Sequence, residues 1–149
     1  MQFLVVFTSA NDSSAASTVL KEIGESGGIG EAVQMDLTQR SSIQEAITEV
    51  GKKYGAISVL VNNAVTGGRH PVRIAESDSE EWLQMIDHNL KATYLVTKMV
   101  LPFMKGSPWG RIVHVSSEIA EDGSRCILLY DDKSRITRFQ WGACRRACE

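Results

Sequence analysis

Cysteine is scarce in this sequence, and charge of one sign does not dominate it. The three cysteines, Cys126, Cys144 and Cys148, are an odd number without a C-x-x-C pair, so they do not predict a disulfide framework. Because no histidines or further cysteines cluster beside them, free thiols are favoured over a metal site. The net charge of -2 gives no electrostatic reason to expect nucleic acid as a partner.

Long hydrophobic runs are missing as well. No apolar run reaches the roughly 20 residues that a membrane-spanning helix needs, and FLVVF (3–7) is too short for the apolar core of a signal peptide. The sequence therefore predicts no membrane association and a cytoplasmic location. With 149 residues, 43% hydrophobic and 23% charged, we expect a single globular domain over residues 1–149.

Short apolar runs, in contrast, are present and predict strands. Three of them are FLVVF (3–7), ISVLV (57–61) and RIVHV (111–115), and a weaker run, EAVQM (31–35), lies between the first two. Continuous β-branched and apolar runs are typical of a parallel sheet that is covered on both faces. We therefore expect these strands to be buried.

Helical patterns separate the strands. They cover residues 13–24, 42–54, 79–104 and 130–147. Ser42 with Glu45, and Ser77 with Glu80, predict capping boxes at two helix starts, and Gly55 predicts a helix end. Alternating strands and helices predict an α/β fold with an open, doubly wound parallel sheet, Rossmann-like, in three αβα layers.

Small and polar residues follow each predicted strand. They occupy residues 8–14, 36–38, 62–65 and 116–117. Taken singly, each group is typical of ordinary turns and helix caps. Ligands of doubly wound sheets bind at the carboxyl ends of the strands, so four such groups together favour a binding site.

Several motifs at these strand ends resemble the short-chain dehydrogenase/reductase family. They are VNNA (61–64), Asn89 within a long helix, GRIVHVSS (110–117) and Tyr130. The block MIDHNLKATYLVTKMVLPFM (85–104) is also similar to the long helix of that family. The resemblance covers nearly the whole chain, and it implies a partial NAD(P)-binding, Rossmann-like domain.

The resemblance implies a catalytic set of Asn89, Ser117, Tyr130 and Lys133, which would interconvert a secondary alcohol and a ketone, as in 3-oxoacyl reductases. Tyr130 would exchange a proton with the substrate oxygen, to which Ser117 would hydrogen-bond. A free tyrosine has a pKa of about 10, and the Lys133 ammonium would favour the phenolate. Hydride would pass to or from a nicotinamide ring. For Asn89, a place on the same helix face as Met85 and Thr93 also predicts burial.

The resemblance also implies a cofactor cleft. Asp36 and Leu37 match the region that touches adenine in relatives, and Asn63 with Ala64 matches the lining of the cleft. No acidic residue stands directly at the end of the first strand to receive an adenosine ribose hydroxyl. Ser9 and Asn11 there suit a 2′-phosphate, so NADP is favoured over NAD.

The chain departs from the family pattern at two places that bear on activity. It resembles the family from the second strand onward, so the predicted sheet is incomplete and the glycine-rich phosphate loop has no match. The cluster GESGGIG (24–30) has fitting glycine spacing, but it follows a helix and leads into a strand, the reverse of what phosphate binding needs. In addition, Lys133 follows Tyr130 by three residues, where the family has four.

These departures leave alternatives open. A catalytically impaired, truncated family member could act as a non-enzymatic binding or dimerising protein, or be a gene fragment. A flavodoxin-like nucleotide binder fits the alternation of elements but does not explain the serine and tyrosine. The helices at 79–104 and 130–147 predict a homo-oligomer. For the enzyme, the resemblance implies a small-molecule alcohol or ketone as the substrate, and the sequence predicts no metal site.

Overall fold

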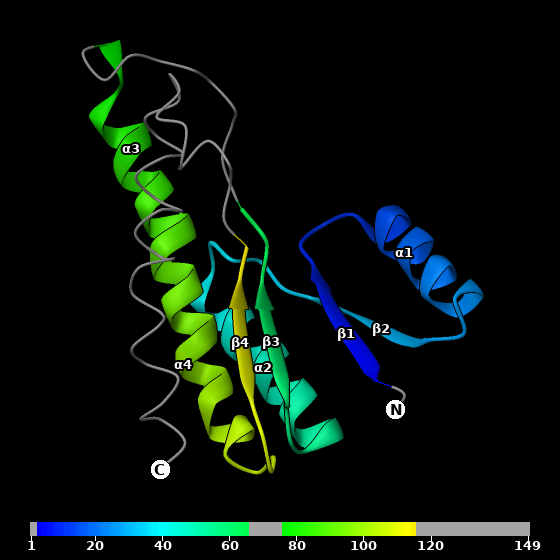
Figure 1. Ribbon diagram of the computed structural model, residues 1–149. Coiled ribbons are helices and arrows are strands. Elements are labelled where there is room, and N and C mark those ends of the chain that lie inside the picture. Colours follow the sequence, from blue (N-terminus) through cyan, green and yellow to red (C-terminus); the bar gives the residue numbers. More distant parts are fainter. Residues whose placement is uncertain (1–2, 66–75, 116–149) are drawn as a thin grey trace. The chain divides into compact units, whose positions relative to one another are not determined.

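The computed structural model describes residues 3–65 and 76–115, and strands and helices alternate along them (Figure 1). The elements are β1 (Leu4–Ser9), α1 (Ser13–Glu25), β2 (Ile29–Gln34), α2 (Arg40–Tyr54), β3 (Val59–Asn62), α3 (Ser79–Ile86), the π-helical turn η2 (Asp87–Lys91), α4 (Ala92–Met104) and β4 (Arg111–His114). The α/β class and the four strands are therefore confirmed. The chain divides into two compact units between Tyr54 and Gly55, and each unit is described by itself.

The first unit is built on the parallel pair of β1 and β2. Their register runs from Leu4 opposite Ile29 to Ser9 opposite Gln34. Helix α1 forms the crossover between them and packs against β2. A strand–helix–strand unit of this kind places the carboxyl ends of both strands at the same edge.

Helix α1 ends in a Schellman motif. The N–H of Gly27 donates to the carbonyl of Gly24 and the N–H of Gly28 to that of Ile23, both at 2.9 Å. Gly27 has a φ of +77°, which a residue without a Cβ adopts at little cost. The helix thus continues one residue past the predicted end at Gly24, because the left-handed turn falls at Gly27.

Helix α2 begins at Arg40, two residues before the predicted start. The capping box expected at Ser42 and Glu45 is wrong, since the Ser42 hydroxyl instead accepts the backbone N–H of Asp36 at 2.9 Å. The predicted end is confirmed, because Gly55 has a φ of +75°. The buried face of the helix consists of Ile43, Ala46, Ile47 and Gly51.

A polar cluster ties the end of α2 to β2. The Lys53 ammonium lies 2.6 Å from the Glu31 carboxylate, and the Tyr54 hydroxyl donates to the same carboxylate oxygen. The hydrogen bond from Lys53 holds the pKa of Glu31 below its ordinary value, and that to Glu31 raises the pKa of Tyr54. This tyrosine is therefore held in its neutral form and stabilises packing.

The second unit contains the parallel pair of β3 and β4, whose register runs from Val59 opposite Arg111 to Asn62 opposite His114. Helix α4 packs against β3.

The predicted long helix is present as α3, η2 and α4. Its cap is Asp78, whose carboxylate accepts the N–H of Glu80 at 2.8 Å, so the predicted cap at Ser77 is one residue early. The buried positions of η2 and α4 are Asn89, Ala92, Val96 and Val100, a spacing of three to four residues that forms one helical stripe.

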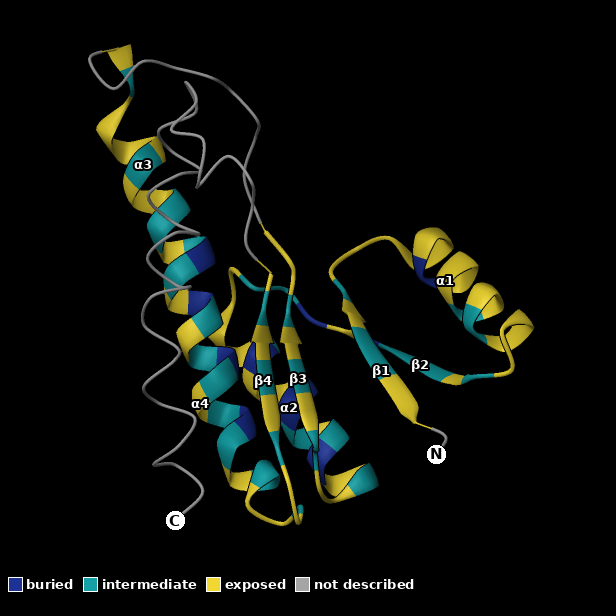
Figure 2. Cartoon of the chain, viewed as in Figure 1, coloured by how far each residue is buried: buried dark blue, intermediate teal, exposed yellow. Residues whose placement is uncertain are grey.

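The strands are less buried than their sequences predict (Figure 2). Within the described residues, β1, β3 and β4 contain no buried residue, and exposed and half-buried residues alternate in β3 and β4. Val61 is 54% exposed and Val113 45%. Because helix α4 packs on one face of its strand pair, alternate side chains of that pair remain at the surface. The expectation of strands covered on both faces is therefore not met in these residues.

Candidate functional site

The loops after β1 and β2 lie next to each other in the first unit. The N–H of Met35 donates to the carbonyl of Ser9 at 2.9 Å, and the Gln34 side-chain amide donates to the carbonyl of Ala10 at 3.2 Å. These bonds hold the two strand ends together. Four predicted cofactor-binding residues lie there: Ser9, Asn11, Asp36 and Leu37.

Asp36 shapes the loop between β2 and α2. One of its carboxylate oxygens accepts the backbone N–H of Thr38 at 2.9 Å and the hydroxyl of the same residue at 2.7 Å. The backbone N–H of Asp36 donates to Ser42. Local hydrogen bonds thus fix both the carboxylate and the backbone N–H of Asp36. The half-buried Asp36 and Leu37 are held at the strand end.

Asp12 lies beside Ser9, one of the predicted cofactor-binding residues, but it was not itself predicted from the sequence. Its carboxylate accepts the N–H of Ala15 at 2.8 Å and caps α1, and its carbonyl accepts the Ser9 hydroxyl at 3.2 Å. An aspartate directly before a predicted helix is the signal that indicates such a cap. The Asp12 carboxylate, three residues after Ser9 in the sequence, is therefore engaged by the helix.

The glycine cluster at 24–30 has a packing role. Gly27 and Gly28 form the end of α1, as described above. A Cβ on Gly30 would lie 2.9 Å from the Cδ1 atom of Ile23 and 3.2 Å from the Cδ2 atom of Leu20, closer than normal carbon contacts. The cluster permits a tight turn and close contact between helix and strand, which explains Gly27, Gly28 and Gly30 without a phosphate.

At the end of β3, neighbouring asparagines have different surroundings. Asn63 and Ala64, predicted to line the cofactor cleft, are exposed. The Asn62 amide nitrogen lies 3.3 Å from the Thr97 hydroxyl of α4 and 3.4 Å from Nε2 of His114 on β4. Successive strand residues point to opposite faces, so Asn62 joins strand to helix while Asn63 stays accessible. This role of Asn62 was not predicted.

Asn89 lies in the π-helical turn η2 and is 5% exposed, which confirms its predicted burial. Its side-chain amide donates to the carbonyl of Met85 at 2.9 Å. In a π-helical turn the backbone hydrogen bonds span five residues instead of the four of an α-helix, and such turns occur frequently at functional sites. The turn therefore marks the only predicted catalytic residue among those that the structure describes.

His114 is half-buried, and its Nδ1 atom is buried without a hydrogen-bond partner among the described residues. Burial lowers the pKa of this imidazole below its ordinary value of 6.5. Among the described residues, this partly desolvated ring pairs with the neutral Asn62 amide, an environment that favours the uncharged form. The residue therefore belongs to the packing of this strand pair and is neutral at pH 7.

We expect the folded state to lose stability as the pH falls through and below about 6.5. In this range His114 binds a proton in the unfolded chain, whereas burial keeps it neutral in the folded state. Above that pH the contribution is fully present. Urea unfolding between pH 7.5 and 5 measures this slope, which His114→Asn should flatten. The matched variant His88→Asn, on η2, should retain the wild-type slope, and an equal slope in all three proteins would contradict this role of His114.

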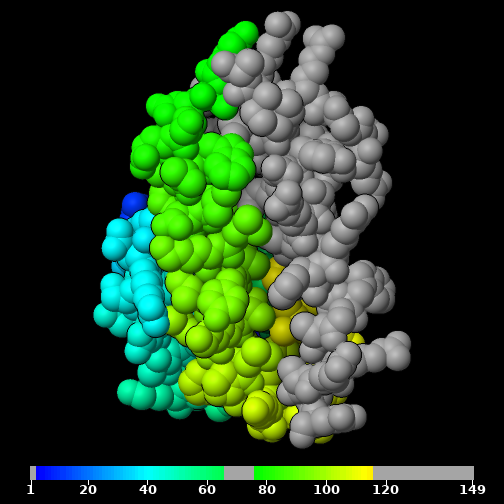
Figure 3. Space-filling model, turned by 90° about the vertical axis from the view of Figure 1, so that its left-hand side faces the viewer, coloured from blue at the N-terminus to red at the C-terminus, as the bar shows by residue number. Residues whose placement is uncertain are grey.

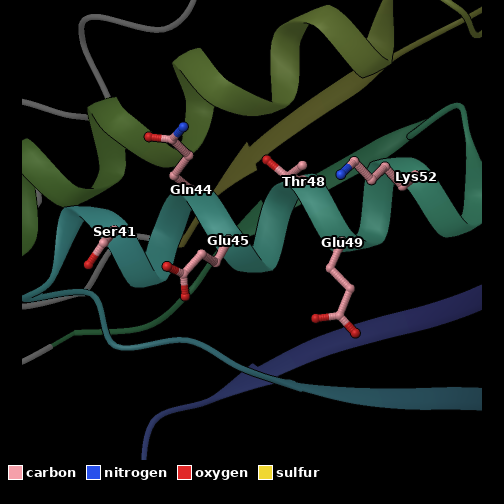
Figure 4. Close-up of a pocket in the computed structure, with 6 residues that line it drawn as sticks. All are labelled: Ser41, Gln44, Glu45, Thr48, Glu49 and Lys52. Carbon is pink, nitrogen blue, oxygen red and sulfur yellow. The ribbon is translucent and has the colours of Figure 1, made fainter.

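The remaining predicted catalytic residues, Ser117, Tyr130 and Lys133, lie outside the described residues, as does the predicted helix at 130–147. A surface hollow in the described part is lined by a single helix (Figure 4). Its lining residues are Ser41, Gln44, Glu45, Thr48, Glu49 and Lys52. They form the polar side of α2 and include none of the predicted site residues.

Residues 3–65 and 76–115 contain neither a metal-binding cluster nor a membrane-spanning helix. In this part of the chain, no three His, Cys, Asp or Glu side chains lie close enough together to hold a metal ion. None of its helices combines the length and apolar character needed to cross a bilayer.

A family model described as short chain dehydrogenase matches residues 1–131. The chain is 42% identical over 91 residues to a 3-oxoacyl-(acyl-carrier-protein) reductase of Thermotoga maritima. The aligned region covers 60% of this chain and 36% of that protein. The chain is 34% identical over 113 residues to the reductase of the same name from Synechocystis, which covers 76% and 45%. The chain spans less than half the length of the curated relatives that it matches.

Solved structures show the same fold. An NADH-dependent reductase complexed with NAD matches with a TM-score of 0.81 and 20% identity, over 93% of this chain and 60% of that one. A short-chain dehydrogenase/reductase of Serratia marcescens matches with a TM-score of 0.81 and 23% identity, over 95% and 57%. These likenesses confirm the predicted Rossmann-like fold.

Proposed function

Because the chain belongs to the short-chain dehydrogenase family, we propose that it is an NAD(P)-dependent oxidoreductase that interconverts a secondary alcohol and a ketone. The observation that carries the proposal is the extent of the family match, residues 1–131. That range includes Asn89, Ser117 and Tyr130 and ends two residues before Lys133. Two relatives named as 3-oxoacyl-(acyl-carrier-protein) reductases support a 3-oxoacyl thioester as the ketone.

In this proposal, the chain's own residues manage the proton. Tyr130 holds the proton that the substrate oxygen takes up or gives back, and the Ser117 hydroxyl orients that oxygen by a hydrogen bond. The Lys133 ammonium favours the phenolate through its charge. Asn89, buried in η2, supports the proton path from the helix side. The bound nicotinamide supplies or accepts the hydride.

We assign the cofactor contacts to Ser9, Asn11, Asp36, Leu37, Asn63 and Ala64. At the end of β1, the exposed Asn11 offers a side-chain amide that can donate to a phosphate. The Ser9 hydroxyl donates to the Asp12 carbonyl in this structure and would turn from it to the phosphate when the cofactor binds. The Asp12 carboxylate, which would repel a phosphate or accept a ribose hydroxyl, already caps α1. This donor set supports NADP in preference to NAD.

Fluorescence titration of the purified chain with NADPH and NADH tests the cofactor assignment. We expect tighter binding of NADPH, and we expect Ser9→Asp to reverse the preference by about tenfold or more, because a carboxylate repels the 2′-phosphate and accepts a ribose hydroxyl. Ser17→Asp, on the exposed side of α1, is the control and should leave the preference unchanged. If neither cofactor binds a folded chain, the non-enzymatic alternative replaces this proposal.

The proposal includes a cytoplasmic homo-oligomer that contacts itself through the helices at 79–104 and 130–147. Helices α3 and α4 lie at the surface in Figure 3. Support for the contact comes from two large apolar side chains on these helices, since Leu83 is 54% and Tyr94 58% exposed. The two residues are about three helical turns apart, and large exposed apolar residues are typical of a contact surface. Sedimentation velocity over a range of concentrations measures the association, and a single monomeric species throughout would contradict it.

A further inference from the structure

The parallel pair of β3 and β4 ends at two polar residues whose side chains contact each other. Asn62 lies opposite His114, and each is the last residue of its strand. The Asn62 amide nitrogen lies 3.4 Å from Nε2 of His114 and 3.3 Å from the Thr97 hydroxyl oxygen on α4. Two strands and a helix therefore meet at one polar group of side chains, the strand-end cluster of Asn62, Thr97 and His114.

The chemistry of these groups determines what each member of the strand-end cluster does. An asparagine amide nitrogen carries two N–H groups and acts only as a donor, so it donates to the Thr97 oxygen and to Nε2 of His114. A neutral imidazole accepts at one nitrogen and carries its proton on the other. Nε2 is therefore the accepting nitrogen, and the proton lies on Nδ1, which is buried without a partner among the described residues.

The face of the strand pair that carries the cluster is otherwise apolar. Two residues before the cluster, the half-buried Leu60 lies opposite the half-buried Ile112. A further apolar pair at the strand end would pack on α4 without desolvating any polar group, whereas burying polar groups is costly unless they are hydrogen-bonded. The polar residues at this position therefore indicate a need for directional bonds in addition to burial.

Each element that meets at the cluster leads to a residue of the proposed site. Asn63, assigned to the cofactor, directly follows β3, and Ser117 stands three residues after the end of β4. Asn89 precedes Thr97 by eight residues on the helix formed by η2 and α4. The ends of elements open more easily than their interiors, and a displacement of about 1 Å can cost about 100-fold in rate. Bonds at the strand ends thus act where the proposed site needs precise geometry.

We propose that His114 is a positioning residue for the proposed reaction, and that its Nε2 atom locks the strand-end cluster by accepting the Asn62 amide. The locked cluster sets the distances between the end of β3, the end of β4 and the helix that carries Asn89. This inference rests on the proposed function, since positioning affects turnover only if the site is catalytic. The ring acts through its neighbours and exchanges no proton with the substrate.

Two substitutions of His114 separate positioning from packing. His114→Gln keeps an acceptor, because the glutamine side-chain oxygen reaches about as far as Nε2, whereas His114→Leu fills a similar space without one. With NADPH and a 3-oxoacyl thioester, we expect His114→Leu to lower kcat by about 10- to 100-fold and to change KM by less than about threefold. His114→Gln should restore kcat to within about threefold of wild type.

Ile112→Val is the matched control for stability. It removes one carbon from the same face of β4, two residues before His114, and leaves the strand-end cluster intact. Its urea midpoint should fall, because a half-buried carbon is lost, while its kcat should stay within about twofold of wild type. A loss of kcat in Ile112→Val equal to that in His114→Leu would show that turnover follows stability, and it would overturn the inference.

Amide hydrogen exchange measures the positioning without any turnover. The N–H of Val115 donates to the Asn62 carbonyl at 3.0 Å beside the cluster, and the N–H of Arg111 donates to the Ser58 carbonyl at 2.9 Å at the other end of the strand pair. We expect the Val115 amide to exchange about tenfold faster in His114→Leu and at the wild-type rate in His114→Gln. The Arg111 amide should keep its wild-type rate in both variants.

The exchange experiment also separates this inference from the proposed function. If the wild-type chain shows no turnover, the proposed function is contradicted, and the rate at Val115 alone decides whether His114 positions the strand ends. Unchanged exchange at Val115 in His114→Leu, or equally fast exchange in His114→Gln, would overturn the inference. If His114→Leu does not fold, Thr97→Val takes its place, because it removes the hydroxyl from the same cluster and should speed exchange at Val115 as well.

Discussion

Replacement of Tyr130 by phenylalanine should lower turnover by about 100- to 10 000-fold, the usual contribution of a positioned general acid or base. The variant keeps the ring and removes only the hydroxyl that would hand its proton to the substrate oxygen. Cofactor affinity should change little, because the cofactor contacts are assigned to other residues. Steady-state oxidation of NADPH with a 3-oxoacyl thioester measures turnover, and the fluorescence titration measures affinity.

Tyr94 provides the matched control for this substitution. It lies on α4 and is 58% exposed, so Tyr94→Phe removes a hydroxyl of the same kind from the surface and should leave turnover within about twofold. Retained turnover in Tyr130→Phe would refute the assignment of Tyr130. Equal losses in both variants would point to a general effect on folding.

Ile43→Ala should destabilise the fold by about 2 to 5 kcal/mol, the range for removing a buried isoleucine side chain down to alanine. Ile43 has 0% exposure and is the largest fully buried side chain among the described residues. Truncation removes three carbons from the buried face of α2 and leaves a cavity. A domain is typically stable by about 5 to 15 kcal/mol, so the loss is a large part of the total.

Urea unfolding followed by circular dichroism measures this change. Glu45→Ala on the exposed side of the same helix is the control and should stay within about 0.5 kcal/mol of wild type. Ile43→Val, which removes a single carbon, should cost about 0.5 to 1.5 kcal/mol. Equal stability of Ile43→Ala and Glu45→Ala would contradict a core role for Ile43.

Local pattern was sufficient for the elements and for one buried polar residue. The apolar runs predicted the four strands of residues 3–65 and 76–115, and Gly55 marked the end of α2 because glycine enters the left-handed region at little cost. The helical period placed Asn89 on the face of Met85 and Thr93, and Asn89 is buried. Such features depend on spacing along the chain, which the sequence contains directly.

Caps were predicted less well, since several nearby side chains compete for the same backbone groups. Asp78 takes the capping position that was expected for Ser77, and the hydroxyl of Ser42 bonds to Asp36 instead of its own helix. The residues that cap and the residues that were expected to cap are all polar, so residue type alone does not show which one caps the helix. The three-dimensional course of the preceding loop decides which group reaches the N–H.

The sequence by itself determined the α/β class, the family and the candidate site residues, because these rest on local periodicity and on short motifs. Only the tertiary structure decided which of the described strands pair, and that Asn62 bonds to Thr97 and lies beside His114. These features join residues as many as 52 positions apart. Contacts across such distances depend on how elements pack, and no pattern of neighbouring residues specifies that packing.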